Sequence, residues 1–187
     1  MTGPKLLVTS GVGKRILLVT GTPGVGKTTL VRRVASQLEG LRLAGFTTEE
    51  IREQGRRVGF RIVPFRGRQR MLAHVDFRGP ARVGRYGVDI AAVDAVSAES
   101  LVPDPAVDLY VVDEIGKMEC LSQRFIASIR ALLDSDRRVL ATIGQKGGGF
   151  IAEAKRHRDA ELQEMTAGNR DLLPERIVAW ARAGGAG

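Results

Sequence analysis

The chain has 187 residues, of which 43% are hydrophobic, and a formal net charge of +8. This length and composition suit one domain with an ordinary core. The apolar runs are short and interrupted by charge, which excludes a membrane-spanning helix and, at the N-terminus, a secretory signal. The single cysteine, Cys120, excludes an internal disulfide and is typical of a reducing compartment, so we expect a cytoplasmic protein.

The residues before the first predicted strand contain a near copy of the motif that follows it. In residues 5–14, Val8 stands where the motif needs its first glycine, and Arg15 stands where a Ser or Thr should follow Lys14. There is also no room for a helix after this copy. We therefore expect residues 1–13 to be a flexible extension and residues 14–187 to form a single domain.

A glycine-rich loop follows the first predicted strand, residues 16–20. It reads Gly21-Thr22-Pro23-Gly24-Val25-Gly26-Lys27-Thr28 and matches the phosphate-binding P-loop, G-x-x-x-x-G-K-[ST], at every fixed position. Apolar residues then recur at helical spacing through residues 28–39, so the loop joins a strand end to a helix N-terminus, where unpaired N–H groups attract anions. In this motif Lys27 reaches the β- and γ-phosphates and the Thr28 hydroxyl ligates Mg²⁺.

The next segment carries the whole net charge. Between Arg52 and Arg85, ten arginines accompany only two acidic residues. Strand patterns at residues 43–48, 57–63 and 70–75 predict a basic β-hairpin inserted after the P-loop unit, formed by the last two strands. Such a patch either attracts polyanions, such as a triphosphate or a nucleic acid, or is only a solvated surface.

Some of these arginines are candidates for a catalytic contact. An arginine that reaches the transferring phosphoryl group accelerates phosphoryl transfer in P-loop enzymes. Arg56 and Arg57 follow Gly55, and Arg85 follows Gly84, so flexible turns can bring their guanidinium groups over the site. We therefore take Arg56, Arg57 and Arg85 as possible arginine fingers; Arg52 and Arg82 are further sources.

Residues 88–101 predict a short helix, and the strand after it ends in two carboxylates, Asp113 and Glu114. In a parallel sheet Asp113 lies beside the P-loop, in reach of the Mg²⁺ shell. Glu114 is then placed to orient or deprotonate a water that attacks the γ-phosphate.

The C-terminal third continues the alternation of strands and helices. Ser122 is a candidate N-cap for an amphipathic helix, residues 138–143 and 161–166 predict strands, and residues 173–182 predict a last helix. In the loop 144–149, Gln145 or Lys146 either senses the γ-phosphate or belongs to a plain flexible loop. The alternation predicts an open, mostly parallel α/β sheet with helices on both faces.

Six stretches carry a family resemblance: Gly21–Thr29, Gly45–Arg52, Gly55–Phe60, Gly84–Val88, Val112–Glu119 and Asn169–Asp171. Together they resemble the small P-loop nucleoside-triphosphatases, a family that includes the human cancer-related nucleoside-triphosphatase and thermophile homologues. The resemblance implies a RecA-like, additional-strand P-loop fold, a three-layer sandwich, with slow Mg²⁺-dependent hydrolysis of ATP, GTP and other nucleoside triphosphates. It maps the phosphate site onto residues 21–29 and a second nucleotide contact onto Val112, Asp113, Glu114 and Ile115.

Three functions remain open. The first is hydrolysis of nucleoside triphosphates by a monomeric protein with low base selectivity, since the loop after residue 143 offers no carboxylate to read guanine. The second is phosphoryl transfer to a nucleoside or a polynucleotide end, with the arginine-rich segment as a clamp. The third is nucleotide-gated binding of nucleic acid through the segment from Arg52 to Arg85.

Overall fold

The computed structural model describes residues 14–184, and the predicted N-terminal extension, residues 1–13, lies outside this range. One mixed sheet of nine strands has the order β5-β6-β4-β3-β2-β7-β8-β1-β9. The strands are β1 (Ile16–Thr20), β2 (Leu43–Glu53), β3 (Arg56–Pro64), β4 (Arg70–His74), β5 (Arg82–Val83), β6 (Tyr86–Val88), β7 (Leu109–Ile115), β8 (Val139–Ile143) and β9 (Ala160–Glu164). The helices are α1 (Lys27–Ser36), α2 (Ile90–Ser100), the 3₁₀ helix η1 (Glu119–Leu121), α3 (Gln123–Asp134), α4 (Gly149–Lys155) and α5 (Leu173–Ala183).

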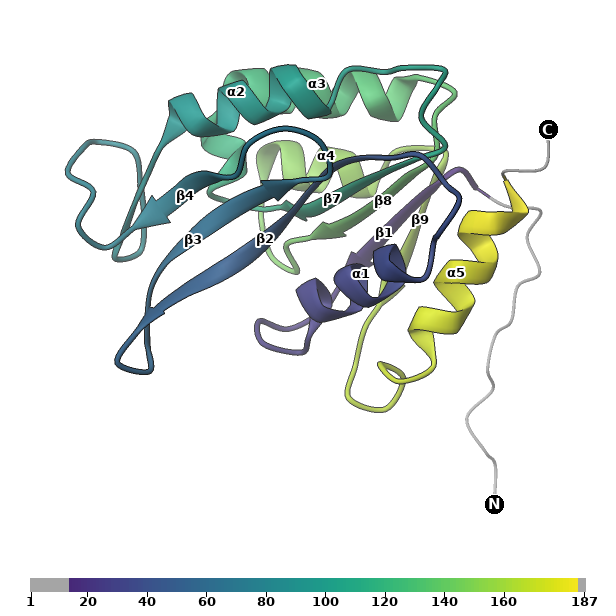
Figure 1. Cartoon of the computed structure of the whole chain (residues 1–187), viewed down its shortest axis with the longest axis horizontal. Coiled ribbons are helices and arrows are strands. Elements are labelled where there is room, and N and C mark those ends of the chain that lie inside the picture. Colours follow the sequence, from purple (N-terminus) through teal and green to yellow (C-terminus); the bar gives the residue numbers. More distant parts are fainter. Residues whose placement is uncertain (1–13, 185–187) are drawn as a thin grey trace.

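Helices cover both faces of this sheet. Figure 1 shows α2, α3 and α4 on one side and α1 and α5 on the other. The alternation of side chains along β1 reflects the two layers: Ile16 and Leu18 join one apolar cluster, and Leu17 and Val19 join the other. Because both faces are covered, β1 and β8 are buried along their whole length, as their unbroken apolar sequences require. The sandwich agrees with the predicted P-loop architecture.

The sheet is parallel in one half and antiparallel in the other. Strands β2, β7, β8, β1 and β9 are parallel neighbours. Strands β3, β4, β5 and β6 extend the sheet through antiparallel pairs, and we call these four strands the wing. The sequence predicted a mostly parallel sheet, and the structure differs from this prediction because the four strands of the wing pair antiparallel.

The predicted basic hairpin is part of the main sheet in the structure and not a separate insertion. Its two strands are β3 and β4, which do pair antiparallel. However, β3 also pairs with β2 from Phe46 to Glu53, so both strands are part of the main sheet. The turn between β2 and β3 lies at Gln54 and Gly55, and Gly55 takes a φ of 78°, which favours glycine. Thus β2 continues five residues beyond the predicted strand end at residue 48.

The second half of the chain shows one agreement with the sequence and one further difference. The Ser122 side chain accepts a hydrogen bond from the Phe125 N–H and caps α3, as predicted. Helix α4 was not predicted, because its seven residues follow a glycine-rich loop and are too few to show a helical period.

None of the helices within residues 14–184 has the length and apolar character needed to cross a membrane.

Candidate functional site

The P-loop connects β1 to α1 in the conformation that its glycines allow. Gly24 and Gly26 have φ values of 81° and 108°, in the left-handed region that other residues disfavour. A side chain at Gly21 would place its Cβ 2.6 Å from the carbonyl oxygen of Met165, so the loop after β9 packs directly against it. No side chain caps the N-terminus of α1. The first N–H groups of α1 are therefore left for an anion.

Lys27 joins the P-loop to the end of β7. Its ammonium group donates to the carbonyl oxygen of Gly21 at 3.1 Å and lies 3.7 Å from Oε2 of Glu114. The side chain is only 11% exposed, which limits screening of its charge by water. A positive charge is thus held between the loop and a carboxylate. The contact of Lys27 with the β- and γ-phosphates stays a prediction from the motif.

Asp113 is held from both neighbouring strands. It is 1% exposed. Its Oδ1 accepts a hydrogen bond from the Thr142 hydroxyl on β8 at 2.6 Å, and its Oδ2 accepts from the Thr48 hydroxyl on β2 at 3.0 Å. The carboxylate therefore has one orientation, fixed by the strands on either side of β7.

Glu114 turns the other way, into a cleft. Its side chain is 34% exposed and faces Lys27. Burial raises the pKa of the Glu114 carboxyl; Lys27 opposes this rise and the charge of Asp113 adds to it. The two adjacent carboxylates thus have separate environments, one fixed inside the sheet and one available to a ligand.

Glu119 is a site residue that the sequence did not assign. It is 5% exposed, yet it lines the same cleft. Burial raises its pKa to about 8, with the charge of Glu114 as a further cause. A Cβ at Gly116 would lie 2.8 Å from an oxygen of Glu114 and 2.8 Å from an oxygen of Glu119, so the bare Gly116 lets both carboxyl groups lie side by side. The sequence carried no spacing signal for this contact, because η1 creates it.

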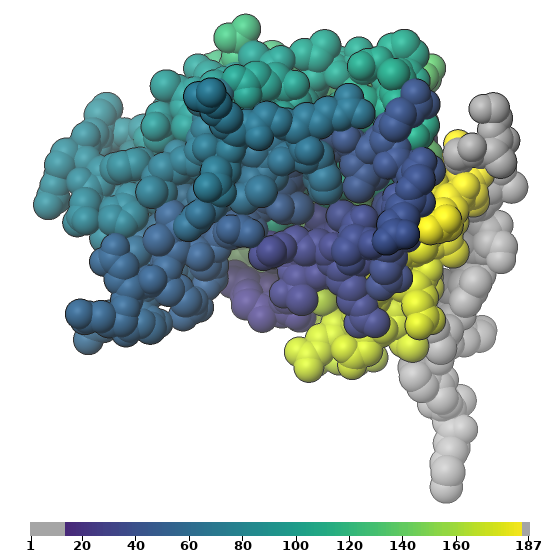
Figure 2. Space-filling model, viewed as in Figure 1, coloured from purple at the N-terminus to yellow at the C-terminus, as the bar shows by residue number. Residues whose placement is uncertain are grey.

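The cleft has a volume of about 1170 Å³. Figure 2 shows the blue β2–β3 hairpin beside the purple P-loop and α1, at the place where the cleft opens. The predicted residues that line the cleft are Gly21, Pro23, Gly24, Gly26, Lys27, Thr28, Thr29, Arg57 and Glu114. Those that do not line it are Thr22, Val25, Arg56, Arg85, Val112, Asp113 and Ile115. Val112 and Ile115 are fully buried in the core and do not line the cleft, and their nucleotide contact stays a prediction.

Among the arginine candidates, Arg57 lies on the cleft wall. Its guanidinium group donates to Glu50 at 2.6 Å and to the Tyr86 hydroxyl at 3.2 Å. Arg85 lies behind it and donates to the Arg57 carbonyl oxygen and to Tyr86. Arg56 is exposed on the hairpin. The three candidates therefore have different positions, and only Arg57 lines the cleft.

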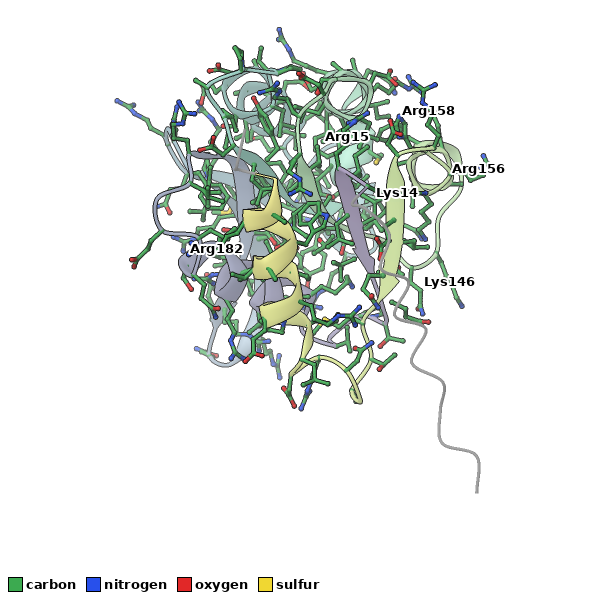
Figure 3. The ribbon with its side chains drawn as sticks, turned by 90° about the vertical axis from the view of Figure 1, so that its right-hand side faces the viewer. Lys14, Arg15, Lys146, Arg156, Arg158 and Arg182 are labelled. Carbon is green, nitrogen blue, oxygen red and sulfur yellow. The ribbon has the colours of Figure 1, made fainter. Side chains whose placement is uncertain are left out.

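The loop after β8 also reaches the cleft. Gln145 and Lys146 line it, and the carbonyl oxygen of Gln145 accepts a hydrogen bond from Lys155 at 2.8 Å. Figure 3 shows Lys146 well away from Lys14 and Arg15, which lie at the opposite end of β1. This position suits the predicted contact with a terminal phosphate.

Thr28 and Asp113 are the predicted residues whose oxygens could hold Mg²⁺. The Thr28 hydroxyl lines the cleft and is a hard ligand of the kind that Mg²⁺ prefers, whereas the buried Asp113 carboxylate, held by Thr48 and Thr142, would act on the ion through water. Within residues 14–184 no group of three or more His, Cys, Asp or Glu side chains could hold a metal by itself. The donor set therefore fits an ion that takes its other ligands from phosphates and water.

Comparison with known proteins identifies the family. A family model described as NTPase matches residues 16–178. The chain belongs to this NTPase family. Nucleoside-triphosphatase THEP1 of Thermotoga maritima is 38% identical over 164 residues, which are 87% of this chain and 93% of the relative. The cancer-related nucleoside-triphosphatase of Homo sapiens is 35% identical over 181 residues, or 88% and 95% of the two chains.

Solved structures of NTPase relatives have the same fold. The crystal structure of THEP1 from the hyperthermophile Aquifex aeolicus gives a TM-score of 0.80 at 33% identity, covering 89% of this chain and 98% of that one. The solution structure of a human cancer-related nucleoside triphosphatase gives a TM-score of 0.77 at 34% identity, covering 90% and 98%. These matches confirm the family resemblance predicted from the sequence.

Proposed function

We propose that this protein is a Mg²⁺-dependent nucleoside-triphosphatase that converts ATP, GTP and other nucleoside triphosphates to diphosphates and phosphate. The observation that carries this proposal is the 3.7 Å approach of Lys27 to Glu114 in a cleft that a complete P-loop lines. The names of its relatives, nucleoside-triphosphatase THEP1 and cancer-related nucleoside-triphosphatase, support the same activity.

Each group has a distinct part in the proposed reaction. The P-loop N–H groups and Lys27 bind the phosphates and stabilise the charge that develops on them. Thr28 would hold Mg²⁺ directly and Asp113, fixed by two threonines, would complete its shell; the ion neutralises charge on the β- and γ-phosphates. Glu114 accepts a proton from the attacking water, and its raised pKa makes it a stronger base than an exposed glutamate.

Arg57 is the arginine that we place at the transferring phosphoryl group. It lines the cleft, and Glu50 and Tyr86 hold its guanidinium group on the wall. A guanidinium held in advance stabilises transition-state charge without first being ordered. Arg85 would support Arg57 from behind, and Arg56 would have no part.

Low base selectivity and slow turnover belong to the same proposal. The residues after β8 that line the cleft are Gly144, Gln145, Lys146 and Ile151, which include no carboxylate to read guanine. We also propose a monomer, and a cytoplasmic location because the single cysteine, Cys120, excludes an internal disulfide and is typical of a reducing compartment.

Replacing Glu114 by Gln tests the assignment of the base. The variant keeps the size of the side chain but cannot accept the proton, so we expect phosphate release to fall by roughly 10³-fold while nucleotide binding persists. The matched control is Glu39→Gln at an exposed site, which should leave both quantities unchanged. Phosphate release by Glu114→Gln at the rate of the parent would overturn the assignment.

A further inference from the structure

The cleft extends beyond the groups that hydrolysis needs. Along the sheet, the P-loop follows β1, Glu114 ends β7, and the wing lies farther in the same direction. Phe60 of β3, Leu72 of β4 and Val83 of β5 line this far end, together with Met118. An apolar compartment therefore adjoins Glu114 on the side away from the P-loop.

The position of Lys27 decides which part of the nucleotide faces this compartment. In a P-loop this lysine reaches the β- and γ-phosphates, and here its ammonium group lies beside Glu114. The γ-phosphate therefore lies at the Glu114 end of the bound triphosphate. A molecule in the wing compartment would approach the γ-phosphorus, which is where the second reactant of a phosphoryl transfer has to be.

The compartment combines an aromatic wall with a polar end. The Phe60 ring packs edge-on against Tyr86 at 5.2 Å between centroids, and the Arg57 guanidinium lies over it at 5.1 Å, so the ring is held in place. At the polar end, Glu119 is nine-tenths buried and lines the cleft. Attack by water, with Glu114 as base, gives this second carboxyl group no task.

The charges at this end favour an uncharged ligand. Glu50 is paired with Arg57 and Arg52, and Glu49 with Arg32 at 3.2 Å, so these three arginines already have partners, whereas Lys117 also lines the cleft. A second phosphate-bearing molecule would meet the carboxylates of Glu49 and Glu50. A nucleoside instead presents a flat base to the aromatic and aliphatic wall and ribose hydroxyls that donate to a carboxylate.

We propose that the wing end of the cleft binds a nucleoside and that the protein transfers the γ-phosphoryl group of a nucleoside triphosphate to a hydroxyl of that nucleoside. This inference rests on the proposed function, because it uses the same triphosphate site. The hydroxyl oxygen forms a bond to the γ-phosphorus, and the bond from the γ-phosphorus to the bridging oxygen of the β-phosphate breaks. The hydroxyl proton passes to Glu114, and the products are a nucleoside monophosphate and a nucleoside diphosphate. Hydrolysis is the same reaction with water in place of the nucleoside.

The test follows the label of γ-labelled ATP in the presence of the four ribonucleosides and the four deoxyribonucleosides, each assayed separately with the full chain. We expect label on at least one nucleoside as well as in free phosphate. Label in free phosphate alone, with all eight nucleosides, would overturn the transfer and leave the proposed hydrolysis standing. If no label leaves ATP in any assay, the proposed function itself fails.

A pair of valine substitutions tests the place of binding. Val83→Trp fills the apolar end of the compartment, and Val102→Trp makes the same change at a residue that is 58% exposed and does not line the cleft. The readout is the share of released label that reaches the nucleoside, which does not depend on the overall rate. We expect Val83→Trp to lower this share by about tenfold or more and Val102→Trp to preserve it. An equal share in both variants would contradict the assignment of the compartment.

Discussion

At the residue scale, the site has two neighbouring carboxyl groups in different protonation environments. Burial raises the pKa of Glu114 against the opposing charge of Lys27, whereas the almost complete burial of Glu119 raises its pKa to about 8. One oxygen of the Glu114 carboxyl group and one of the Glu119 carboxyl group lie beside Gly116. Pairs of carboxyls whose pKa values are pushed apart have separate roles in acid–base chemistry. At neutral pH, Glu119 is thus mostly protonated and Glu114 is the better proton acceptor.

The raised pKa of Glu119 makes a prediction about stability. Between pH 4.5, its ordinary pKa, and about pH 8, the folded protein holds a proton on Glu119 that the unfolded chain has lost. The contribution of this group to the free energy of unfolding is therefore fully present below pH 4.5 and is lost as the pH rises to about 8. Glu119→Gln removes this dependence. We expect the variant to gain stability relative to the parent by on the order of 3 kcal/mol between pH 5 and pH 8, measured by urea unfolding.

The control for this prediction is Glu39→Gln, at an exposed position. Its free energy of unfolding should follow that of the parent at every pH. A constant difference between Glu119→Gln and the parent across this range would show that Glu119 ionises in the folded protein as it does in the unfolded chain.

At the element scale, hydrogen bonds from two neighbouring strands fix the end of β7. Thr142→Val keeps the size of the side chain and removes the hydroxyl that donates to buried Asp113 at 2.6 Å. We expect a loss of about 2–3 kcal/mol in the free energy of unfolding, because a buried carboxylate oxygen loses its donor. The matched change is Thr20→Val, since the buried Thr20 hydroxyl has no partner within residues 14–184. That variant should be within about 0.5 kcal/mol of the parent or more stable. Equal losses in both variants would refute the role of the Thr142 hydroxyl.

The β2–β3 hairpin carries a prediction about catalysis. Arg57→Ala should lower kcat by roughly 10²-fold with little change in nucleotide affinity, because the contact is made mainly in the transition state. Arg56→Ala, one residue away and outside the cleft lining, should stay within about threefold of the parent. Steady-state phosphate release measures both variants. Loss of activity in Arg56→Ala with normal Arg57→Ala would place the catalytic contact on the other side of the hairpin.

The sequence predicted those elements whose signal is local. A fixed motif, an apolar run or a capping serine, each within about ten residues, indicated the P-loop, α1, β7 and the α3 cap. The sequence indicated a flexible turn at Gly55, but the charged residues between Glu49 and Glu53 hide the continuation of β2 up to that turn. The wing depends on pairing between strands that are distant in the sequence, and the burial of Glu119 depends on how η1 packs. Neither feature produces a local periodic pattern of apolar residues that could be recognised in the sequence.

At the scale of the whole molecule, the charge is less available than the composition suggests. The whole net charge of +8 lies between Arg52 and Arg85. In the structure, Arg52 and Arg57 pair with Glu50, and Arg70 pairs with Glu99. Acidic residues from outside the segment thus neutralise part of it. Of these three arginines only Arg57 lines the cleft, where its position accords with a triphosphate substrate.

The central claim is that the P-loop and Lys27 bind a triphosphate for attack at its γ-phosphorus. The most direct measurement is phosphate release from ATP, GTP, CTP and UTP by the parent and by Lys27→Ala, with Mg²⁺ and with the metal chelated. We predict release from all four nucleotides by the parent with Mg²⁺, with kcat/KM values within about tenfold of one another, and a loss of roughly 10²-fold or more in Lys27→Ala or without metal. Equal phosphate release by the parent and Lys27→Ala would contradict the account.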